Sequence, residues 1–377
     1  MRIAFHLPHG LTEEGVARPW PSPESSASSG GPSGDRIMAS LLVRGLRERG
    51  HEVAILSALP TGDLWRGTRS TFALLPEAVA VRRRVRGFSP DAVLVCGPTM
   101  NYPDFFGWWQ RPPRYVLFGA GLGKGNWQGR ALRAVSSWVH HQALRRANVI
   151  TTYQPSLVSV FERLAPHASI HCLPPIARDW SALPDKAAAR AALGLDRNAP
   201  VVLCVSRLTE ATPRRRGKAA MVVRLLQAMS ELNSEAVLLL VGGGPGEGVV
   251  KHAVEKHGLD ERVRWFDSTL DLGPFYAASD VFAFPDDRDL PRLAVLEAEA
   301  AGRPVVTNRS PSSETIVDDG RTGLLANDDS EFVADLDRIL ADRRLAEKMG
   351  RVGVDYVRER HSLPVRLAQL ESLLEAQ

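Results

Sequence analysis

The apolar residues of the chain fall into short runs that alternate with stretches of helical spacing. In the first half, runs of strand length occur at residues 3–7, 53–56, 92–96 and 115–118. Between them, 37–49 and 131–147 have helical spacing, and Gly50 is placed to end the earlier helix. Strands that alternate with helices predict a parallel sheet covered by helices.

The same alternation restarts in the second half, after a stretch interrupted by prolines at 174, 175 and 184. Strands are predicted at 201–205, 236–241, 263–266, 281–284 and 304–307. Helices are predicted at 186–193, 221–232, 249–257 and 292–301. We therefore predict an α/β protein with two Rossmann-like domains, 1–178 and 179–360. A terminal helix in 361–377 is expected to pack back toward the first domain.

Composition supports an ordinary globular protein with two cores. The chain has 377 residues, of which 44% are hydrophobic and 24% charged, and a net charge of +4. Arginines cluster at 82–86 and 214–216, which suits either a solvated surface or an anionic partner. Cys96, Cys172 and Cys204 lack metal-ligand spacing and read as small buried side chains in a reducing compartment. Because the chain has no membrane-length apolar run and no signal-peptide pattern, we expect it in the cytoplasm. We also expect no nucleic-acid partner.

Two glycine clusters stand where a strand passes into a helix, at 30–34 and 242–246. Glycine allows close backbone approach, and a helix start offers free N–H groups to a phosphate. Neither cluster fits the dinucleotide fingerprint, so each reads equally well as a tight turn. Arg207 and Lys218 follow the strand 201–205 and could supply the fixed positive charge that a bound diphosphate needs.

A pair of carboxylates follows the strand 281–284. Asp289 is expected in a loop and Glu297 on an apolar helix. An ionised carboxylate can accept hydrogen bonds from two neighbouring hydroxyls of a sugar or ribose. A buried, unpaired carboxylate would cost several kcal/mol, so Glu297 requires a partner. Asp289 can equally be an exposed loop acid.

Several motifs occur in a fixed order along the chain. They are Gly30-Gly31, 46–53, 205–208, 239–245, 262–266, 276–285, 296–306 and 319–325. This ordered set resembles the retaining glycosyltransferases of family 4. The family has the GT-B fold, in which two Rossmann-like domains with parallel sheets face an interdomain cleft.

The resemblance implies roles for individual residues. It assigns catalysis to Arg207, Lys218 and Asp289, with the two cations on the diphosphate and Asp289 facing the sugar hydroxyls. It assigns donor binding to Glu297, Gly30, Gly31, Gly244, Phe266, Leu290, Pro291, Arg292 and Leu293. Glu297 would hold the ribose diol. The reaction would retain configuration and need no metal and no cofactor, with a UDP- or GDP-sugar as the expected co-substrate.

The chain departs from the family pattern at several places, among them Pro174-Pro175, where the family has Asn-Gly, and the longer segment 209–217. The first acid is Asp289 rather than glutamate, and the family's Gly-Phe-Gly is replaced by Leu290-Pro291-Arg292. These changes predict an altered sugar pocket and an unusual donor sugar. Phe118 stands where the family often has a histidine. The run 287–289 has the Asp-x-Asp form of a metal site, an alternative that the surrounding motifs disfavour.

The first domain is expected to bind the acceptor. Its candidate residues are Trp108, Trp109, Phe118 and Trp127, which could stack on an acceptor ring, pack in the core or touch a membrane. The Pro/Ser/Gly-rich segment 18–34 is expected to act as a lid. We expect a small-molecule acceptor in specialised metabolism, such as antibiotic biosynthesis. The alternatives are a membrane enzyme with a lipid-linked or polysaccharide acceptor, or a non-catalytic nucleotide-sugar binder. No oligomeric state is predicted.

Overall fold

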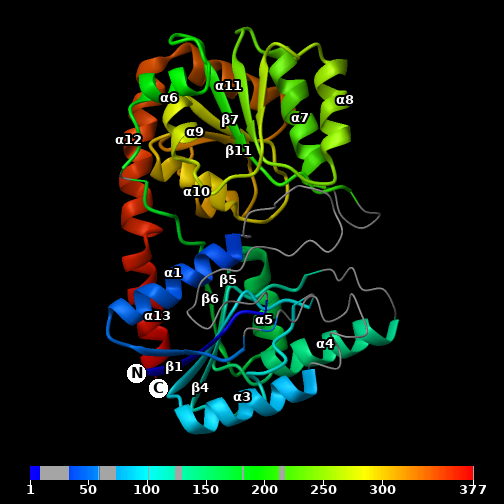
Figure 1. The fold of residues 1–377 in the computed structure, drawn as a ribbon, viewed down its shortest axis with the longest axis vertical. Coiled ribbons are helices and arrows are strands. Elements are labelled where there is room, and N and C mark those ends of the chain that lie inside the picture. The colour runs from blue at the N-terminus through cyan, green and yellow to red at the C-terminus, as the bar shows by residue number, and fades with distance from the viewer. Residues whose placement is uncertain are drawn as a thin grey trace. The chain divides into compact units, whose positions relative to one another are not determined.

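The computed structural model describes residues 1–8, 34–57, 59, 74–100, 102–123, 130–180, 182–211 and 217–376. These residues form two compact units (Figure 1). The first unit contains the described residues up to Pro175 together with those from Leu363 onward. The second unit spans Ile176–Ser362. Of the segments singled out from sequence, 18–34 lies largely and the arginines 214–216 lie wholly outside the described residues.

The first unit is a six-stranded parallel sheet with helices. Its strands are β1 (Arg2–His6), β2 (Glu52–Ile55), β3 (Ala92–Cys96), β4 (Arg114–Phe118), β5 (Val149–Thr152) and β6 (Ser169–Cys172). Its helices are α1 (Gly34–Glu48), α3 (Leu74–Phe88), α4 (Arg130–Leu144), η1 (Pro155–Leu157), α5 (Val158–Leu164) and α13 (Leu363–Glu375). The strand order is β2-β1-β3-β4-β5-β6.

The second unit repeats this architecture. Its strands are β7 (Val201–Val205), β8 (Val237–Val241), β9 (Val263–Phe266), β10 (Val281–Phe284), β11 (Val305–Asn308) and β12 (Gly323–Ala326). The helices before β11 are α6 (Lys186–Ala192), α7 (Lys218–Glu231), α8 (Glu247–Lys256), α9 (Gly273–Ala278) and α10 (Leu293–Ala300). Those after it are η2 (Ser313–Thr315), α11 (Asp329–Ala341) and α12 (Arg343–Arg360). The strands are parallel in the order β12-β11-β10-β7-β8-β9.

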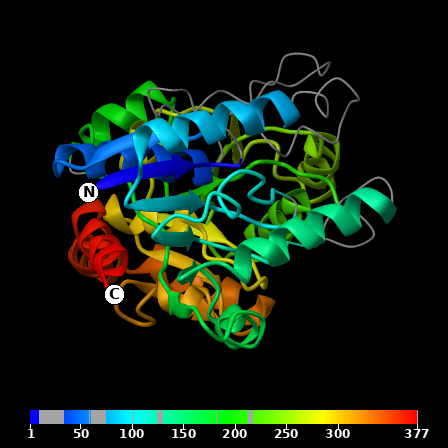
Figure 2. The ribbon, with the colours of Figure 1, turned by 90° about the horizontal axis from the view of Figure 1, so that it is seen from below.

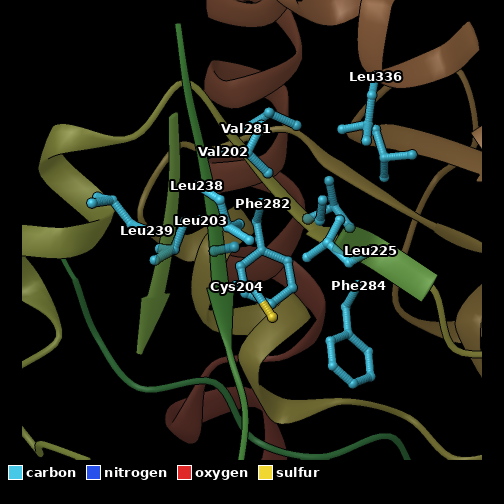
Figure 3. Close-up of a cluster of buried hydrophobic side chains, with 14 of the residues drawn as sticks. Val202, Leu203, Cys204, Leu225, Leu238, Leu239, Val281, Phe282, Phe284 and Leu336 are labelled. Atoms are coloured by element: carbon cyan, nitrogen blue, oxygen red, sulfur yellow. The ribbon is translucent and has the colours of Figure 1, made fainter. Parts of the chain in front are cut away.

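The core of the second unit explains why its central strands, β7, β8 and β10, are continuous apolar runs. A parallel sheet with helices on both faces buries its side chains in both directions. Figure 3 shows the Phe282 ring of β10 beside Cys204 of β7, with Leu225 of α7 and Leu336 of α11 in the same cluster. All four side chains are at most 1% exposed. The predicted strands 201–205, 263–266 and 281–284 are confirmed at their exact residues.

The C-terminal helix belongs to the first unit. Helix α13 lies beside α1, red beside blue in Figures 1 and 2. A Cβ atom on Gly45 of α1 would meet Leu367 Cδ1 at 2.5 Å, so glycine permits the close approach of the two helices. Arg49 and His51, which follow α1, both bind the Glu371 carboxylate, at 2.5 and 2.9 Å.

Two further predictions concern cysteines and membranes. Among the described residues these cysteines form no disulfide; Cys96 and Cys204 are buried as expected, whereas Cys172 is only half-buried. Within the described ranges, every helix is too short or too polar to cross a membrane.

Candidate functional site

The strand order of the second sheet marks one place for a ligand. From β7 the chain proceeds outward to β8 and β9, and it then returns to β10, on the other side of β7, before continuing to β11 and β12. β7 and β10 are therefore adjacent strands from which the connections diverge. In open α/β sheets, ligands bind outside the carboxyl ends of the strands at such a switch point. Most of the donor-site candidates of the second unit follow β7, β8 or β10.

The cationic candidates follow β7. Arg207 is exposed, two residues beyond the last residue of the strand. Lys218 is the first residue of α7, which begins three residues earlier than the sequence predicts, and Thr209 Oγ1 accepts a hydrogen bond from its backbone N–H (3.0 Å). Burial raises the pKa of the Cys204 thiol to about 12, and the charge of Lys218 partly opposes this rise.

The glycine turn after β8 lies directly against the segment that carries Arg207. Gly242 and Gly244 have φ values of 141° and 144°, which side chains rarely adopt. A Cβ on Gly242 would meet the Ser206 carbonyl oxygen at 1.9 Å, and one on Gly244 would meet the Leu208 oxygen at 2.7 Å. The Gly244 N–H donates to Glu247 Oε1 (2.9 Å). Close backbone packing therefore accounts for these glycines, and a phosphate role for Gly244 stays a prediction.

The loop after β10 is held by an acid that the sequence did not single out. Asp286 is 3% exposed and forms ion pairs with Arg288 (2.7 Å from Nε) and with Arg292. The Arg292 guanidinium also lies 5.1 Å from the centroid of the Phe284 ring. Asp289 accepts a hydrogen bond from Ser312 Oγ (2.5 Å). Asp287, the third acid of this loop, lies 3.6 Å from Arg224, so the loop that contains Leu290 and Pro291 is anchored at each of its acids.

Glu297 has the partner that its burial requires. Its side chain is 3% exposed on α10, where Arg178 forms an ion pair with Oε1 and the Tyr276 hydroxyl donates to Oε2 (3.3 Å). The Arg178 guanidinium also lies 4.6 Å from the centroid of the Trp180 ring. The expectation of a partner is confirmed. Arg178 itself was not foreseen, since it is 119 residues away in sequence and no local pattern links the two.

The aromatic neighbours of this carboxylate keep it in an apolar setting. Burial and the adjacent Glu297 charge raise the pKa of Tyr276 well above its usual value, so its hydroxyl stays a hydrogen-bond donor. The Tyr276 ring lies 5.2 Å from that of Trp180. Phe266, the last residue of β9, packs edge-on against Phe275 at 5.0 Å.

The first sheet has its own switch point, between β1 and β3. His6, the last residue of β1, lies 2.8 Å through Nδ1 from Asp104 Oδ1, and the Tyr115 hydroxyl donates to Oδ2 (2.5 Å). Backbone N–H groups of Phe106 and Gly107 donate to the same carboxylate. Burial alone would raise the pKa of Asp104, but His6 and the hydrogen bonds from Tyr115 and Gly107 lower it. Sequence patterns did not show this buried network because His6 and Asp104 are 98 residues apart.

The acceptor candidates lie in different settings. Trp108 is half-buried, 5.6 Å edge-on from Trp138 and 5.2 Å below the Arg146 guanidinium. Trp109 is also half-buried, and its indole N–H donates to a backbone carbonyl (3.0 Å). Phe118 is fully buried and packs edge-on against a tyrosine at 6.1 Å. The remaining candidates of the first half, Gly30, Gly31 and Trp127, lie outside the described residues.

Comparison with known proteins bears on the same segment of the chain. Residues 199–342 match the family Glycosyl transferases group 1. This match covers β7 to α11 and therefore Arg207, Lys218, Asp289 and Glu297. The chain is similar to the group 1 glycosyl transferases in the unit where its site candidates gather.

Similar proteins extend the comparison beyond this segment. A GDP-mannose-dependent alpha-(1-6)-phosphatidylinositol monomannoside mannosyltransferase of Mycolicibacterium smegmatis is 31% identical over 255 residues, 63% of this chain and 65% of the relative. The chain thus spans just under two thirds of that relative.

Solved structures show the same fold over the whole chain. Sucrose-phosphate synthase of Thermosynechococcus elongatus has a TM-score of 0.73 at 18% identity. The match covers 99% of this chain and 98% of the synthase chain. Anabaena HepE in complex with UDP-glucose has a TM-score of 0.70 at 15% identity, with both chains covered completely. The predicted fold class, two parallel-sheet α/β domains of the GT-B type, is confirmed.

Proposed function

We propose that the chain is a glycosyltransferase that takes a sugar from a nucleoside-diphosphate sugar. The observation that carries this proposal is the buried Glu297 on α10, at the switch point where Arg207 and Lys218 follow the adjacent strand. A carboxylate that accepts a diol and fixed cations beside it fit the two ends of such a donor. The match of 199–342 to group 1 glycosyl transferases supports the same assignment.

The donor-site candidates of the second unit have separate roles in this proposal. Arg207 and Lys218 bind the diphosphate, and Glu297 accepts hydrogen bonds from the ribose hydroxyls. Asp289 faces the sugar hydroxyls, together with the backbone of Leu290 to Leu293. Phe266 lies toward the base, and Gly244 approaches the phosphates. Because Asp289 is shorter than glutamate and the loop contains Pro291, we expect an unusual donor sugar.

The proposed reaction retains configuration and needs no metal ion. The bond between the sugar C1 and the diphosphate oxygen breaks, and the acceptor oxygen forms its bond to C1 on the same face. The acceptor proton passes to the departing diphosphate, so that atoms and charge balance. Arg207 and Lys218 would stabilise the negative charge that grows on the leaving group, which is stabilisation of the transition state rather than of the substrate.

We assign acceptor binding to the first unit, around Trp108 and Trp109. UDP or GDP is the proposed nucleotide, since HepE is described in complex with UDP-glucose and the mycobacterial relative by its dependence on GDP-mannose. A small-molecule acceptor in the cytoplasm, as in specialised metabolism, remains our first proposal.

A membrane acceptor is the second candidate, and one observation favours it. Val135 and Trp138 of α4 are 45% and 55% exposed, and the mycobacterial relative is named for a phosphatidylinositol acceptor. Flotation with anionic vesicles separates the two candidates. Flotation that is lost in Trp138→Ser supports the membrane acceptor, and a chain that stays at the bottom supports the small-molecule acceptor.

The proposed function is tested by comparing substitutions of two buried acids on α10, Glu297 and Glu299. Glu297→Gln should reduce donor turnover at least a hundredfold, while Glu299→Gln, two residues away and bound to Thr322, should retain it. Release of nucleoside diphosphate from a panel of UDP- and GDP-sugars measures turnover, and NMR of the product's anomeric coupling reports retention. Donor binding without any release would favour the non-catalytic binder. Equal activity of wild type and Glu297→Gln would contradict the proposal.

A further inference from the structure

A cavity of the second unit lies at the opposite edge of the sheet from Arg207 and Glu297. Its volume is about 590 Å³, within the range of about 300–1,000 Å³ typical of small-molecule sites. It is enclosed by α6, by the residues that precede β7, β10 and β11, and by α12. These strands begin here, whereas the proposed donor site lies where they end.

The wall of this cavity carries an excess of positive charge. Its cationic side chains are Lys186, Arg190, Arg197, Arg303, Arg343 and Arg351, and its carboxylates are Asp185, Asp280 and Glu347. Asp185 accepts from two backbone N–H groups of α6 (2.9 and 3.0 Å), and Glu347 binds Arg343 (2.9 Å). Two of the three carboxylates are therefore already engaged.

Asp280 is shared by the innermost cations. Lys186 Nζ lies 2.6 Å from Oδ1, and Arg190 Nη2 lies 2.8 Å from Oδ2. Oδ2 also accepts the backbone N–H of Val201 (2.7 Å). Arg303, the third cation, donates to the Ser279 carbonyl (2.9 Å). The single negative charge of Asp280 thus cannot neutralise the positive charges of Lys186, Arg190 and Arg303.

The pKa values of Lys186 and Arg303 are lowered in this excess of positive charge. Burial lowers the pKa of Lys186, and the charges of Arg303 and Arg190 lower it further against the opposing effect of Asp280. Burial and the charge of Arg190 likewise lower the pKa of Arg303, against the opposing charges of Asp280 and Glu347. Repulsion among partly buried cations is relieved when an anion enters among them.

We propose that this cavity binds a phosphate-bearing anion, either free pyrophosphate or a phosphomonoester. Arginine presents planar pairs of N–H donors that match phosphate oxygens, and the cavity has five arginines on its wall. Arg197 and Arg351 are exposed at its rim, where they would contact an incoming phosphate. The lining carries too many charges to suit an apolar ligand. This site goes beyond the proposed transferase function and uses none of its residues.

The experiment compares two double variants of α12 with identical charge change. Arg343→Glu/Arg351→Glu alters the cavity wall, whereas Arg344→Glu/Lys348→Glu alters exposed residues of the same helix outside the wall. Both are made in the full chain with Arg207→Ala, which removes one of the two proposed donor-site cations. Circular dichroism checks that each variant folds.

Isothermal titration with inorganic pyrophosphate and, separately, with uridine monophosphate measures binding. We expect the wall variant to weaken pyrophosphate binding at least tenfold and the control variant to change it less than twofold. If uridine monophosphate binds and the wall variant weakens that binding, the cavity is a phosphomonoester site. If pyrophosphate binds there and uridine monophosphate does not, the cavity is a site for the free anion. Equal loss in both double variants, or no binding in the Arg207→Ala chain, would overturn the proposal. Donor turnover in Glu297→Gln is a separate measurement, so either proposal can fail alone.

Discussion

Three buried acids of the second unit differ in what they contact, and this difference sets what each can do. Glu297 is ion-paired with Arg178, and Asp286 with two arginines of its own loop. Glu299 accepts one hydrogen bond from Thr322, and its second oxygen has no hydrogen-bond partner among the described residues. At the residue scale, the first two are charged anchors, while the third is a carboxyl group whose burial favours its neutral form.

Removing the partner of Glu297 should destabilise the chain. Arg178→Gln leaves a buried carboxylate without its cation, which typically costs about 3 kcal/mol of unfolding free energy. Urea denaturation followed by fluorescence measures this loss. The double variant Arg178→Gln/Glu297→Gln should lose less than the sum of the two single variants, because the unpaired charge is gone. Strict additivity would show that the two side chains do not interact in solution.

Glu299 should make stability fall as pH rises. Burial raises its pKa well above the usual value, and the charge of Asp318 raises it further. The folded state then holds a proton that the unfolded state releases above about pH 4.3, so stability is full below that pH and is lost as pH rises through the folded pKa. The melting temperature of Glu299→Gln relative to wild type should therefore increase between pH 5 and pH 9. Glu261→Gln, an exposed control, should show no such trend.

At the scale of elements, the turn after β8 positions the segment after β7. Gly242→Ala introduces a Cβ 1.9 Å from the Ser206 carbonyl oxygen at a φ of 141°. The backbone must move, so we expect a loss of at least about 2 kcal/mol in unfolding free energy. Donor affinity should fall as well, because Arg207 follows Ser206. Thermal denaturation and donor titration measure both effects.

The control for this turn is a glycine with free space around it. Gly248 lies in α8, and an added Cβ would meet nothing within 4 Å. Gly248→Ala should be neutral or stabilise by up to about 1 kcal/mol through helix propensity. A Gly242→Ala chain as stable as wild type would show that the turn tolerates displacement.

The elements that sequence predicts well are those whose pattern is local. β7 and β10 are continuous apolar runs, β9 is apolar except at Arg264, and Gly50, with a φ of 85°, ends the helix as predicted. Helix α3 was not predicted, since its arginine run suggested a polar surface rather than an element. The pairing of Arg178 with Glu297 depends on tertiary contact and leaves no mark in spacing. The order of the motifs predicts the site candidates, but the ion pairs that hold them arise only when the chain folds.

At the scale of the whole chain, the C-terminal helix stabilises the N-terminal unit. α13 packs on α1, and Arg114 of β4 donates to the Leu373 carbonyl (2.8 Å from Nη2). The carboxylate of Glu371 binds Arg49 and His51. The first unit therefore contains both the earliest and the latest described residues of the chain, and completing it requires the last helix.

This connection predicts where a truncation acts. A chain that ends at Ser362 exposes the α1 face that α13 covers and removes the partners of Arg49 and His51. We expect faster amide hydrogen exchange in peptides of β1 and α1, with little change in β7 and β8, because the lost contacts lie in the first unit. Gly45→Leu in the full-length chain should reproduce the effect by displacing Leu367. Exchange that rises equally in both units would mean that α13 stabilises the chain as one cooperative whole. Unchanged exchange in α1 would show that the packing of α13 contributes nothing to the first unit.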